Sequence, residues 1–121
     1  MRSLTICLLW GEQMSKYGNK RCEYNGLKFD SMKERDYYIY LSSMEKSGRI
    51  FDLKTQTKFF LQKGFEFNGK KIRPITYKAD FTYYDKDGKF HVVDTKGVKT
   101  QVYLLKKKMM MYIYKIEIEE V

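Results

Sequence analysis

The sequence has little of what most metal centres, disulfide frameworks and membrane anchors require. Its 121 residues include one histidine, two cysteines and one proline. A single histidine argues against zinc sites and against nucleophiles that depend on a histidine base. Cys7 and Cys22 are too few for a disulfide framework and lack metal-ligand spacing, which favours a reducing, cytoplasmic setting. No apolar run approaches the ~20 residues of a membrane span, so we expect no membrane partner.

Basic and aromatic residues are abundant instead. Lysine and arginine number 24 against 15 acidic residues, which gives a formal net charge of +9. Such an excess favours a polyanionic partner, because neutralising phosphates releases counterions. A lysine-rich solvated surface is the alternative explanation. Aromatic residues make up 17% of the chain, which argues against disorder.

The N-terminal residues differ from the rest. The apolar run 4–10 is short for a signal peptide, and residues 11–13 do not form a small-residue cleavage site. Met14 reads like a natural beginning of the protein. We therefore expect residues 1–13 to be a non-native or disordered extension, and residues 14–121 to form a single domain.

Hydrophobic periodicity and turn signals predict the order of elements from residue 31 onward. Ser31 and Glu34 form an S-x-x-E capping box that opens a helix to about Ser47. A strand follows over 50–61, and then a hairpin over 65–73 whose turn is an Asn-Gly pair.

In the second half of the chain, apolar and polar residues alternate along a predicted hairpin. Two arms, 75–84 and 90–96, flank a turn that places Gly88 in the left-handed region. A helix runs from Thr100 to residue 112 or 114, and a strand covers 116–121. The order α-β-β-β-α-β predicts an α/β or α+β fold with layered helices and sheet.

The hairpin brings two acids and a lysine together. A type I turn with a G1 bulge at Gly88 pairs Asp85 with Lys89, and the same register places Asp80 opposite Asp94. Lys96 shares their face by strand periodicity. Opposed carboxylates repel unless a raised pKa, a lysine or a divalent cation compensates. Oxygen-only ligands favour Mg²⁺ or Mn²⁺ over zinc.

These residues resemble a known signature. Asp80-Phe81, followed by Asp94-Thr95-Lys96, is similar to the D…(D/E)-x-K motif of the PD-(D/E)xK nucleases, which include restriction enzymes and Holliday-junction resolvases. Residues 15–121 more closely resemble a family of small phage and prophage proteins of Gram-positive bacteria. Its matching stretches are Lys16–Lys20, Phe29–Glu34, Ile75–Phe81 and Val92–Gly97.

The resemblance implies a restriction-endonuclease-like core with a central mixed sheet flanked by helices. It also implies a Mg²⁺-dependent (or Mn²⁺-dependent) DNA endonuclease, with branched DNA among its candidate substrates. Asp80, Asp94 and Lys96 would be catalytic, and Glu34 matches the helix glutamate that completes the metal site in several branches. The family's proline is missing, because Ala79 precedes Asp80. Capping alone is the alternative explanation for Glu34.

Further residues are candidates for nucleic-acid contact. Lys106, Lys107 and Lys108 could bind phosphates with help from Lys99, although a solvated helix face explains them equally well. Gln56 could contact DNA or metal-bound water. The three methionines at 109–111 are typical of core filling.

Several functions stay open on the sequence alone. The leading prediction is DNA hydrolysis in phage replication, recombination or DNA processing. A non-catalytic basic DNA-binding protein that retains the fold is the main alternative. An RNA-directed nuclease and a structural or host-inhibitory protein are two others. A homodimer is attractive, because cutting two strands requires two sites.

Overall fold

The computed structural model describes residues 21–121 of the chain. They form two compact units, one ending at Ser47 and the other beginning at Gly48. The extension expected over residues 1–13, and the Lys16–Lys20 stretch, lie outside the described residues. Within residues 21–121 no helix is both long and apolar enough to cross a membrane.

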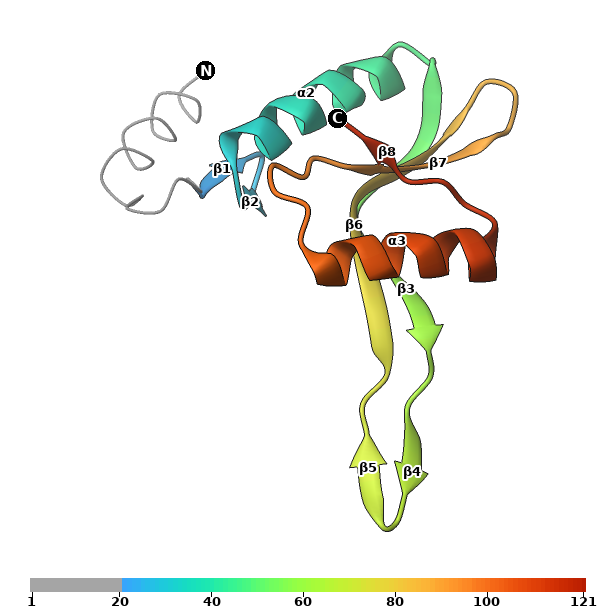
Figure 1. The fold of residues 1–121 in the computed structure, drawn as a ribbon. Coiled ribbons are helices and arrows are strands. Elements are labelled where there is room, and N and C mark those ends of the chain that lie inside the picture. The colour runs from blue at the N-terminus through green and yellow to red at the C-terminus, as the bar shows by residue number, and fades with distance from the viewer. Residues whose placement is uncertain (1–20) are drawn as a thin grey trace. The chain divides into compact units, whose positions relative to one another are not determined.

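The first unit contains a short hairpin and a helix. Strands β1 (Cys22–Tyr24) and β2 (Leu27–Phe29) pair antiparallel, and helix α2 (Met32–Lys46) follows (Figure 1). The hairpin turns at Asn25 and Gly26, which have φ values of 53° and 79°. Positive φ at both central positions is the geometry of a type I′ turn, which an Asn-Gly pair favours.

Helix α2 begins and ends where its capping residues predict. The side-chain oxygen of Ser31 accepts a hydrogen bond from the Glu34 N–H at 3.0 Å. Gly48 has a φ of +77° just past the helix end, as expected of a C′ glycine. One detail differs from the capping box, because the Glu34 carboxylate accepts from the Asp30 N–H at 3.1 Å rather than from Ser31.

The second unit is built on a four-stranded mixed sheet in the order β3-β6-β7-β8. Its strands are β3 (Ile50–Gln62), β6 (Ile75–Asp85), β7 (Phe90–Asp94) and β8 (Glu119–Glu120). The first three pair antiparallel, whereas β7 and β8 are parallel.

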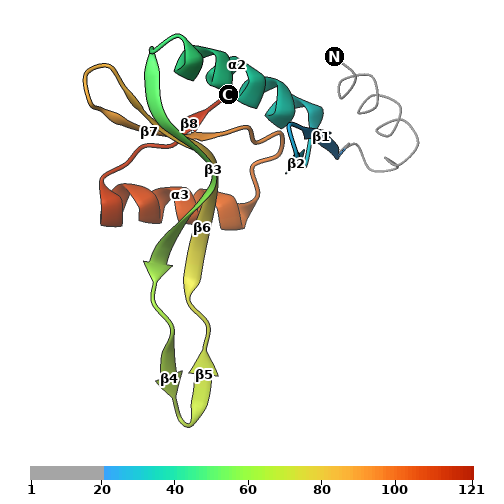
Figure 2. The same ribbon diagram turned by 180° about the vertical axis from the view of Figure 1, so that it is seen from behind.

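Helix α3 (Gln101–Tyr114) makes the crossover that a parallel pair requires (Figure 2). The predicted α-β-β-β-α-β order and the α+β class are confirmed. The last strand is shorter than the predicted 116–121.

One face of the sheet and helix α3 share a hydrophobic core. Tyr103 and Met110 of α3 are buried against the sheet residues of this cluster. The other members of the cluster are Leu61, Tyr77, Ala79, Val92 and Ile118. Met110 is fully buried, so its truncation to alanine is expected to cost about 2–5 kcal/mol. Of the three methionines predicted to fill the core, Met111 is instead 41% exposed.

The β6–β7 hairpin has the predicted turn and register. The Gly88 N–H donates to the Asp85 carbonyl at 3.0 Å, and the Asp85 N–H donates to the Lys89 carbonyl at 2.9 Å. Gly88 has a φ of +82°. The ladder runs to the pair Phe81–Val93, one step short of the predicted pair Asp80–Asp94.

The simple alternation expected along β6 breaks down near Asp80. Thr57 lies opposite Ala79 in the ladder, yet its hydroxyl is 2.8 Å from that of Thr82. Thr82, which the alternation placed with the polar residues, is only 1% exposed. Gln56, the β3 residue across from Asp80, has a φ of 55°. A positive φ in a non-glycine strand residue is strained. Here it immediately precedes Thr57, whose side chain contacts Thr82 rather than its ladder partner Ala79.

Beyond the ends of β3 and β6, the chain extends into a two-stranded ribbon. Strands β4 (Phe65–Phe67) and β5 (Lys70–Ile72) pair antiparallel. Asn68 and Gly69 have φ values of 51° and 77°, which confirms the predicted Asn-Gly hairpin. In Figure 1 this ribbon points away from the core formed with α3.

Candidate functional site

Asp94 is the most unusual acid in the second unit. It ends strand β7 and is only 1% exposed. Its Oδ2 accepts a hydrogen bond from the Tyr77 hydroxyl at 2.6 Å. Its Oδ1 is buried and has no hydrogen-bond donor among the described residues. The closest cation is the Lys96 ammonium, 4.0 Å from Oδ1, which is too far for a hydrogen bond. One buried oxygen is thus available for a ligand.

The surroundings of Asp94 disfavour its ionised form. Burial raises the pKa of this carboxyl to about 6. The Tyr77 hydrogen bond and the Lys96 charge act in the opposite direction, whereas the nearby Asp80 charge raises the pKa further. Burial, followed by the bond to Asp94, raises the pKa of the Tyr77 hydroxyl well above its usual range. Tyr77 therefore stays protonated and donates to Asp94.

Asp80 lies on strand β6, near enough to Asp94 for its charge to raise the pKa of that carboxyl, and has a different partner. Its Oδ2 accepts from the Thr95 N–H at 2.9 Å and from the Thr95 hydroxyl at 2.7 Å. These two bonds tie the segment that follows β7 to β6. They also set the backbone direction from which Lys96 extends, so Asp80 positions this segment.

Lys96 lies between the acids and solvent. Its ammonium is 5.4 Å from the ring centroid of Tyr103, within cation–π range. Its side chain is 39% exposed, against 1% for Asp94. An ammonium so placed can meet an anionic group that approaches Asp94 from solvent.

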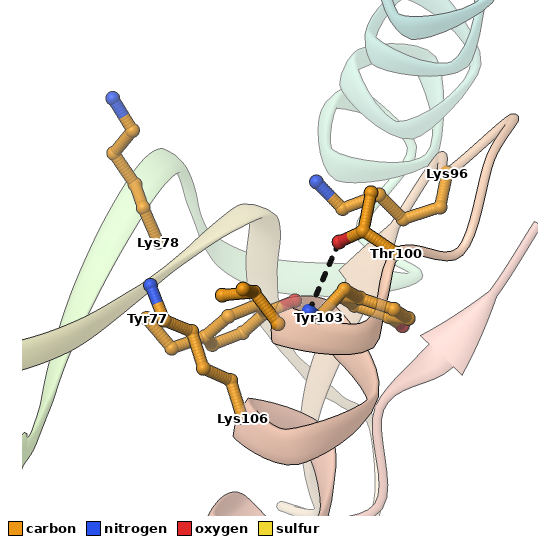
Figure 3. Close-up of a pocket in the computed structure, with 7 residues that line it drawn as sticks. Tyr77, Lys78, Lys96, Thr100, Tyr103 and Lys106 are labelled. Atoms are coloured by element: carbon orange, nitrogen blue, oxygen red, sulfur yellow. Dashed lines mark hydrogen bonds between the residues drawn. The ribbon is translucent and has the colours of Figure 1, made fainter.

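A pocket of about 270 Å³ opens beside these residues (Figure 3). Three lysines line it: Lys78 from β6, Lys96 from the segment after β7, and Lys106 from α3. The remaining lining residues are Tyr77, Thr100, Val102 and Tyr103. Tyr77 connects the pocket to Asp94, because its ring lines the pocket and its hydroxyl binds the acid. The lining combines positive charge with hydrogen-bond donors, which suits a phosphate.

A hard divalent cation fits the two aspartates. Both ligands offer oxygen atoms, which Mg²⁺ and Mn²⁺ prefer. The buried Oδ1 of Asp94 is an acceptor without a donor, and a cation would satisfy it. Over residues 21–121, no group of three histidines, cysteines or acids is arranged to hold a metal. The residues at hand are therefore Asp80 and Asp94, which would leave further coordination positions to water and substrate.

Glu34 belongs to the first unit. It occupies the first turn of α2, is 3% exposed and binds the Asp30 N–H. Ser31 caps the Glu34 N–H as predicted, but the Glu34 carboxylate binds the Asp30 N–H in place of the Ser31 N–H. Its service as a third metal ligand stays a prediction. Asp80, Asp94 and Lys96, by contrast, lie together in the second unit.

The four lysines predicted to contact nucleic acid divide into two pairs. The ammonium groups of Lys99 and Lys107 each lie 3.2 Å from the Glu120 carboxylate. The Tyr103 hydroxyl, followed by these lysines, lowers the pKa of Glu120 to about 2, so Glu120 stays ionised and holds both cations. Lys106 lines the pocket and Lys108 is exposed.

Sequence reasoning missed three contributors to the site. Tyr77 belongs to the core cluster, and its hydroxyl also binds Asp94. Thr95, the middle residue of the Asp-x-Lys motif, binds Asp80 through its backbone and its side chain. Lys78 lines the pocket. A tyrosine on the strand that pairs with the strand of Asp94 was the one available signal, because a buried hydroxyl needs a partner.

Comparison with known proteins gives one match. Residues 14–119 match a family model described as protein of unknown function (DUF1064). No curated protein and no solved structure matches the chain.

Proposed function

The chain belongs to the DUF1064 family, and we propose from its site that it is a metal-dependent endonuclease that hydrolyses phosphodiester bonds in DNA. The observation that carries the proposal is the buried Oδ1 of Asp94. It lacks a donor, belongs to a carboxyl whose pKa the nearby Asp80 charge raises, and is 4.0 Å from the Lys96 ammonium. A purely structural acid in such a position would be expected to have its oxygens satisfied.

Each residue of the site has a place in such a reaction. Asp80 and Asp94 would hold the cation, and Tyr77 fixes the orientation of Asp94 through its hydroxyl. A bound Mg²⁺ or Mn²⁺ supplies Lewis acidity toward the phosphodiester and lowers the pKa of water. Lys96 stabilises the negative charge that develops on the phosphoryl oxygens. Lys78 and Lys106 hold neighbouring phosphates at the pocket.

The wider setting follows from the same proposal. A basic nuclease encoded by a phage or prophage would act in the host cytoplasm during replication, recombination or processing of phage DNA. A duplex cut by a chain with one site requires two copies, so a homodimer on DNA is part of the proposal. Lys99, Lys107 and Lys108 would add long-range attraction to the polyanion.

Cleavage of a small DNA panel tests the proposal. Supercoiled plasmid, single strand, flap and four-way junction are incubated with Mg²⁺, Mn²⁺ or EDTA. We expect metal-dependent cutting by the natural chain and loss of cutting in Asp94→Asn. Asp87→Asn is the matched control, because Asp87 is exposed in the turn of the same hairpin. Metal-dependent cutting that survives Asp94→Asn would overturn the assignment of this site.

Metal binding is measured separately from cutting. Titration calorimetry with Mn²⁺ should give a binding isotherm for the natural chain and for Asp87→Asn. Asp80→Asn and Asp94→Asn should each weaken it strongly. Glu34→Gln in the same titration decides whether the α2 glutamate is a further ligand, since a residue that only caps the helix leaves Mn²⁺ affinity unchanged.

A non-catalytic DNA-binding protein is the second candidate. The three lysines of the pocket favour it, because they can hold phosphates without any metal. This candidate predicts salt-sensitive DNA binding that EDTA does not alter, together with no cutting of any substrate in the panel. Under that outcome, Asp94 would be a remnant of a nuclease fold.

A further inference from the structure

The segment from Gln62 through Ile75, here named the arm, is exposed at every residue. It contains β4 and β5 and the turn at Asn68 and Gly69. The arm begins just after Leu61, which is buried in the core cluster. Figures 1 and 2 show it projecting beyond α3 from both sides. An isolated two-stranded ribbon is only marginally stable in water, so this geometry is typical of a segment that binds a partner.

The base of the arm is tightly built. A Cβ at Gly64 would lie 3.0 Å from the Ile72 carbonyl oxygen and 3.3 Å from Cδ of Pro74. A side chain at this position would therefore be tightly crowded, and glycine suits the close approach of the two chains. The close approach joins the exposed ribbon to the end of the β3–β6 ladder at the pair Gln62–Ile75.

The two faces of the arm differ in chemistry. The ladder sets Phe65 opposite Ile72 and Phe67 opposite Lys70, and these four residues share one face. Their apolar side chains are 46%, 38% and 63% exposed for Phe65, Ile72 and Phe67. The opposite face carries the pair Glu66–Lys71. One face of the ribbon is therefore aromatic and uncovered by any described residue.

The charge of the arm indicates which partner covers it. Four cations, namely Lys63, Lys70, Lys71 and Arg73, stand against one acid, Glu66. None of these four cations is ion-paired with another residue in the range 21–121. A second copy of the arm would bring like charges together, which opposes association. A polyanion is attracted instead.

We infer that the arm is a DNA-binding ribbon that contacts the duplex beside the phosphodiester to be cut. The inference rests on the proposed function for its substrate. The major groove of B-form DNA is wide enough for a two-stranded ribbon, whereas that of A-form RNA is too deep and narrow for side chains to read. Exposed phenylalanines can pack against the thymine methyl groups that the major groove presents.

The arm is continuous with the candidate site. Strand β6 leads from the arm to Lys78, which lines the pocket. At about 3.3 Å per strand residue, the chain from Lys70 to Lys78 covers at most roughly 26 Å. That length corresponds to about seven or eight base pairs at 3.4 Å per step. The arm would therefore extend the footprint by that amount to one side of the cut.

Binding of a fluorescent 30-base-pair duplex in EDTA tests the inference without any cleavage. The first variant is Lys70→Gln/Lys71→Gln. Its matched control is Lys86→Gln/Lys89→Gln, which removes two exposed lysines from the turn of the β6–β7 hairpin. The third variant is Phe65→Ser/Phe67→Ser. All three alter exposed residues, so the fold should persist, and its melting temperature is measured for each.

The expected results separate charge from stacking. The Lys70/Lys71 variant should lower the slope of log affinity against log salt by about 2, with roughly tenfold weaker binding at low salt. The phenylalanine variant should weaken binding while the slope is unchanged. In a footprinting experiment, the protected region of the duplex should be shorter on one side in both arm variants. The Lys86/Lys89 control should retain the natural footprint.

Three outcomes would overturn the inference. In the first, the arm variants bind DNA as the Lys86/Lys89 control does. In the second, they change the oligomeric state and leave DNA binding intact, which would assign the arm to a second copy. In the third, the natural chain does not bind DNA. Failure of the proposed function looks different, because metal-dependent cutting would then be absent while the arm variants still weaken binding.

Discussion

The two ends of the β6–β7 hairpin hold their acids in opposite ways. At the turn end, Asp85 accepts hydrogen bonds from the backbone N–H groups of Asp87 and Lys89. It also contacts His91 at 2.8 Å, and His91 contacts Glu119 on its other ring nitrogen. The bond to His91, followed by that from Lys89, lowers the pKa of Asp85. This end is electrostatically satisfied by the protein itself.

At the other end, the protein leaves its acid incompletely satisfied. Asp94 keeps one oxygen without a donor, and burial raises its pKa to about 6. The same two strands carry both arrangements, so strand geometry does not explain the difference. The acids of the turn contribute to folding, whereas Asp94 costs the fold free energy when it is ionised. Such a cost is expected where a site is built for a ligand.

The largest expected difference between the two ends is catalytic. Lys96→Gln should lower kcat by about 10²–10³, because it removes a positive charge from the transition state. Mn²⁺ affinity should stay the same or increase, since the lost ammonium repels the cation. Lys89→Gln, an exposed lysine at the turn end of β7, should leave kcat unchanged. Single-turnover cleavage measures kcat, and calorimetry measures Mn²⁺ affinity. An equal loss of kcat in Lys96→Gln and Lys89→Gln would show that the two ends of the hairpin do not differ in catalysis.

The next effect concerns stability without metal. The folded pKa of Asp94 lies above its unfolded value, so its contribution is fully present below pH 3.8 and is lost as pH rises through about 6. At neutral pH the loss amounts to about 3 kcal/mol, from 1.36 kcal/mol per pKa unit. Asp94→Asn should therefore raise the free energy of unfolding in EDTA by about 2–3 kcal/mol.

Removing the acid at the turn end of the hairpin should change the free energy of unfolding in the opposite direction. Asp85→Asn should destabilise the fold at neutral pH, because the lowered pKa of Asp85 means that its ionised form favours the folded state. Urea unfolding of both variants between pH 4 and 8 measures these changes. A destabilised Asp94→Asn at pH 7 would show that the Asp94 carboxylate is satisfied in the protein after all.

Tyr77→Phe should have an effect of similar size through the same acid, with the opposite sign. The variant removes the single hydroxyl that binds Asp94 Oδ2 at 2.6 Å, and the pKa of Asp94 should rise further. A hydrogen bond to a charged group contributes about 1.5–3 kcal/mol, so unfolding at pH 7 should become easier by about that amount. The pH at which half of the Mn²⁺ binds should also shift upward. Tyr103→Phe, which loses a bond to Glu120 instead, should leave that pH unchanged.

Local patterns were sufficient to predict most of the fold. The capping residues Ser31 and Thr100 begin their helices as expected. The turn at Gly88 has the predicted hydrogen bonds, and the register follows from it as far as the pair Phe81–Val93. These predictions hold because caps and turns depend on residues only a few positions apart.

Contacts between distant segments were not predictable in the same way. The change of face at Thr57, whose hydroxyl contacts that of Thr82, coincides with the positive φ of Gln56, which glutamine seldom adopts. The pairing of Lys99 and Lys107 with Glu120 required the parallel β8, which brings the C-terminal end beside α3. The bond from Tyr77 to Asp94 crosses the sheet between β6 and β7. Each depends on tertiary placement that periodicity does not encode.

The smallest expected effect belongs to His91 at the turn end. Burial lowers its pKa, but the hydrogen bonds to Asp85 and Glu119 outweigh burial and raise it above 6.5. Its contribution to stability is therefore fully present below pH 6.5 and is lost as pH rises through the folded pKa. His91→Gln should cost under about 1 kcal/mol at pH 6, because Glu119 is partly exposed, and less at pH 8. Urea unfolding at the two pH values measures the difference. A loss as large at pH 8 as at pH 6 would mean that the imidazole acts through packing on the Tyr83 ring, 4.9 Å away, rather than through its charge.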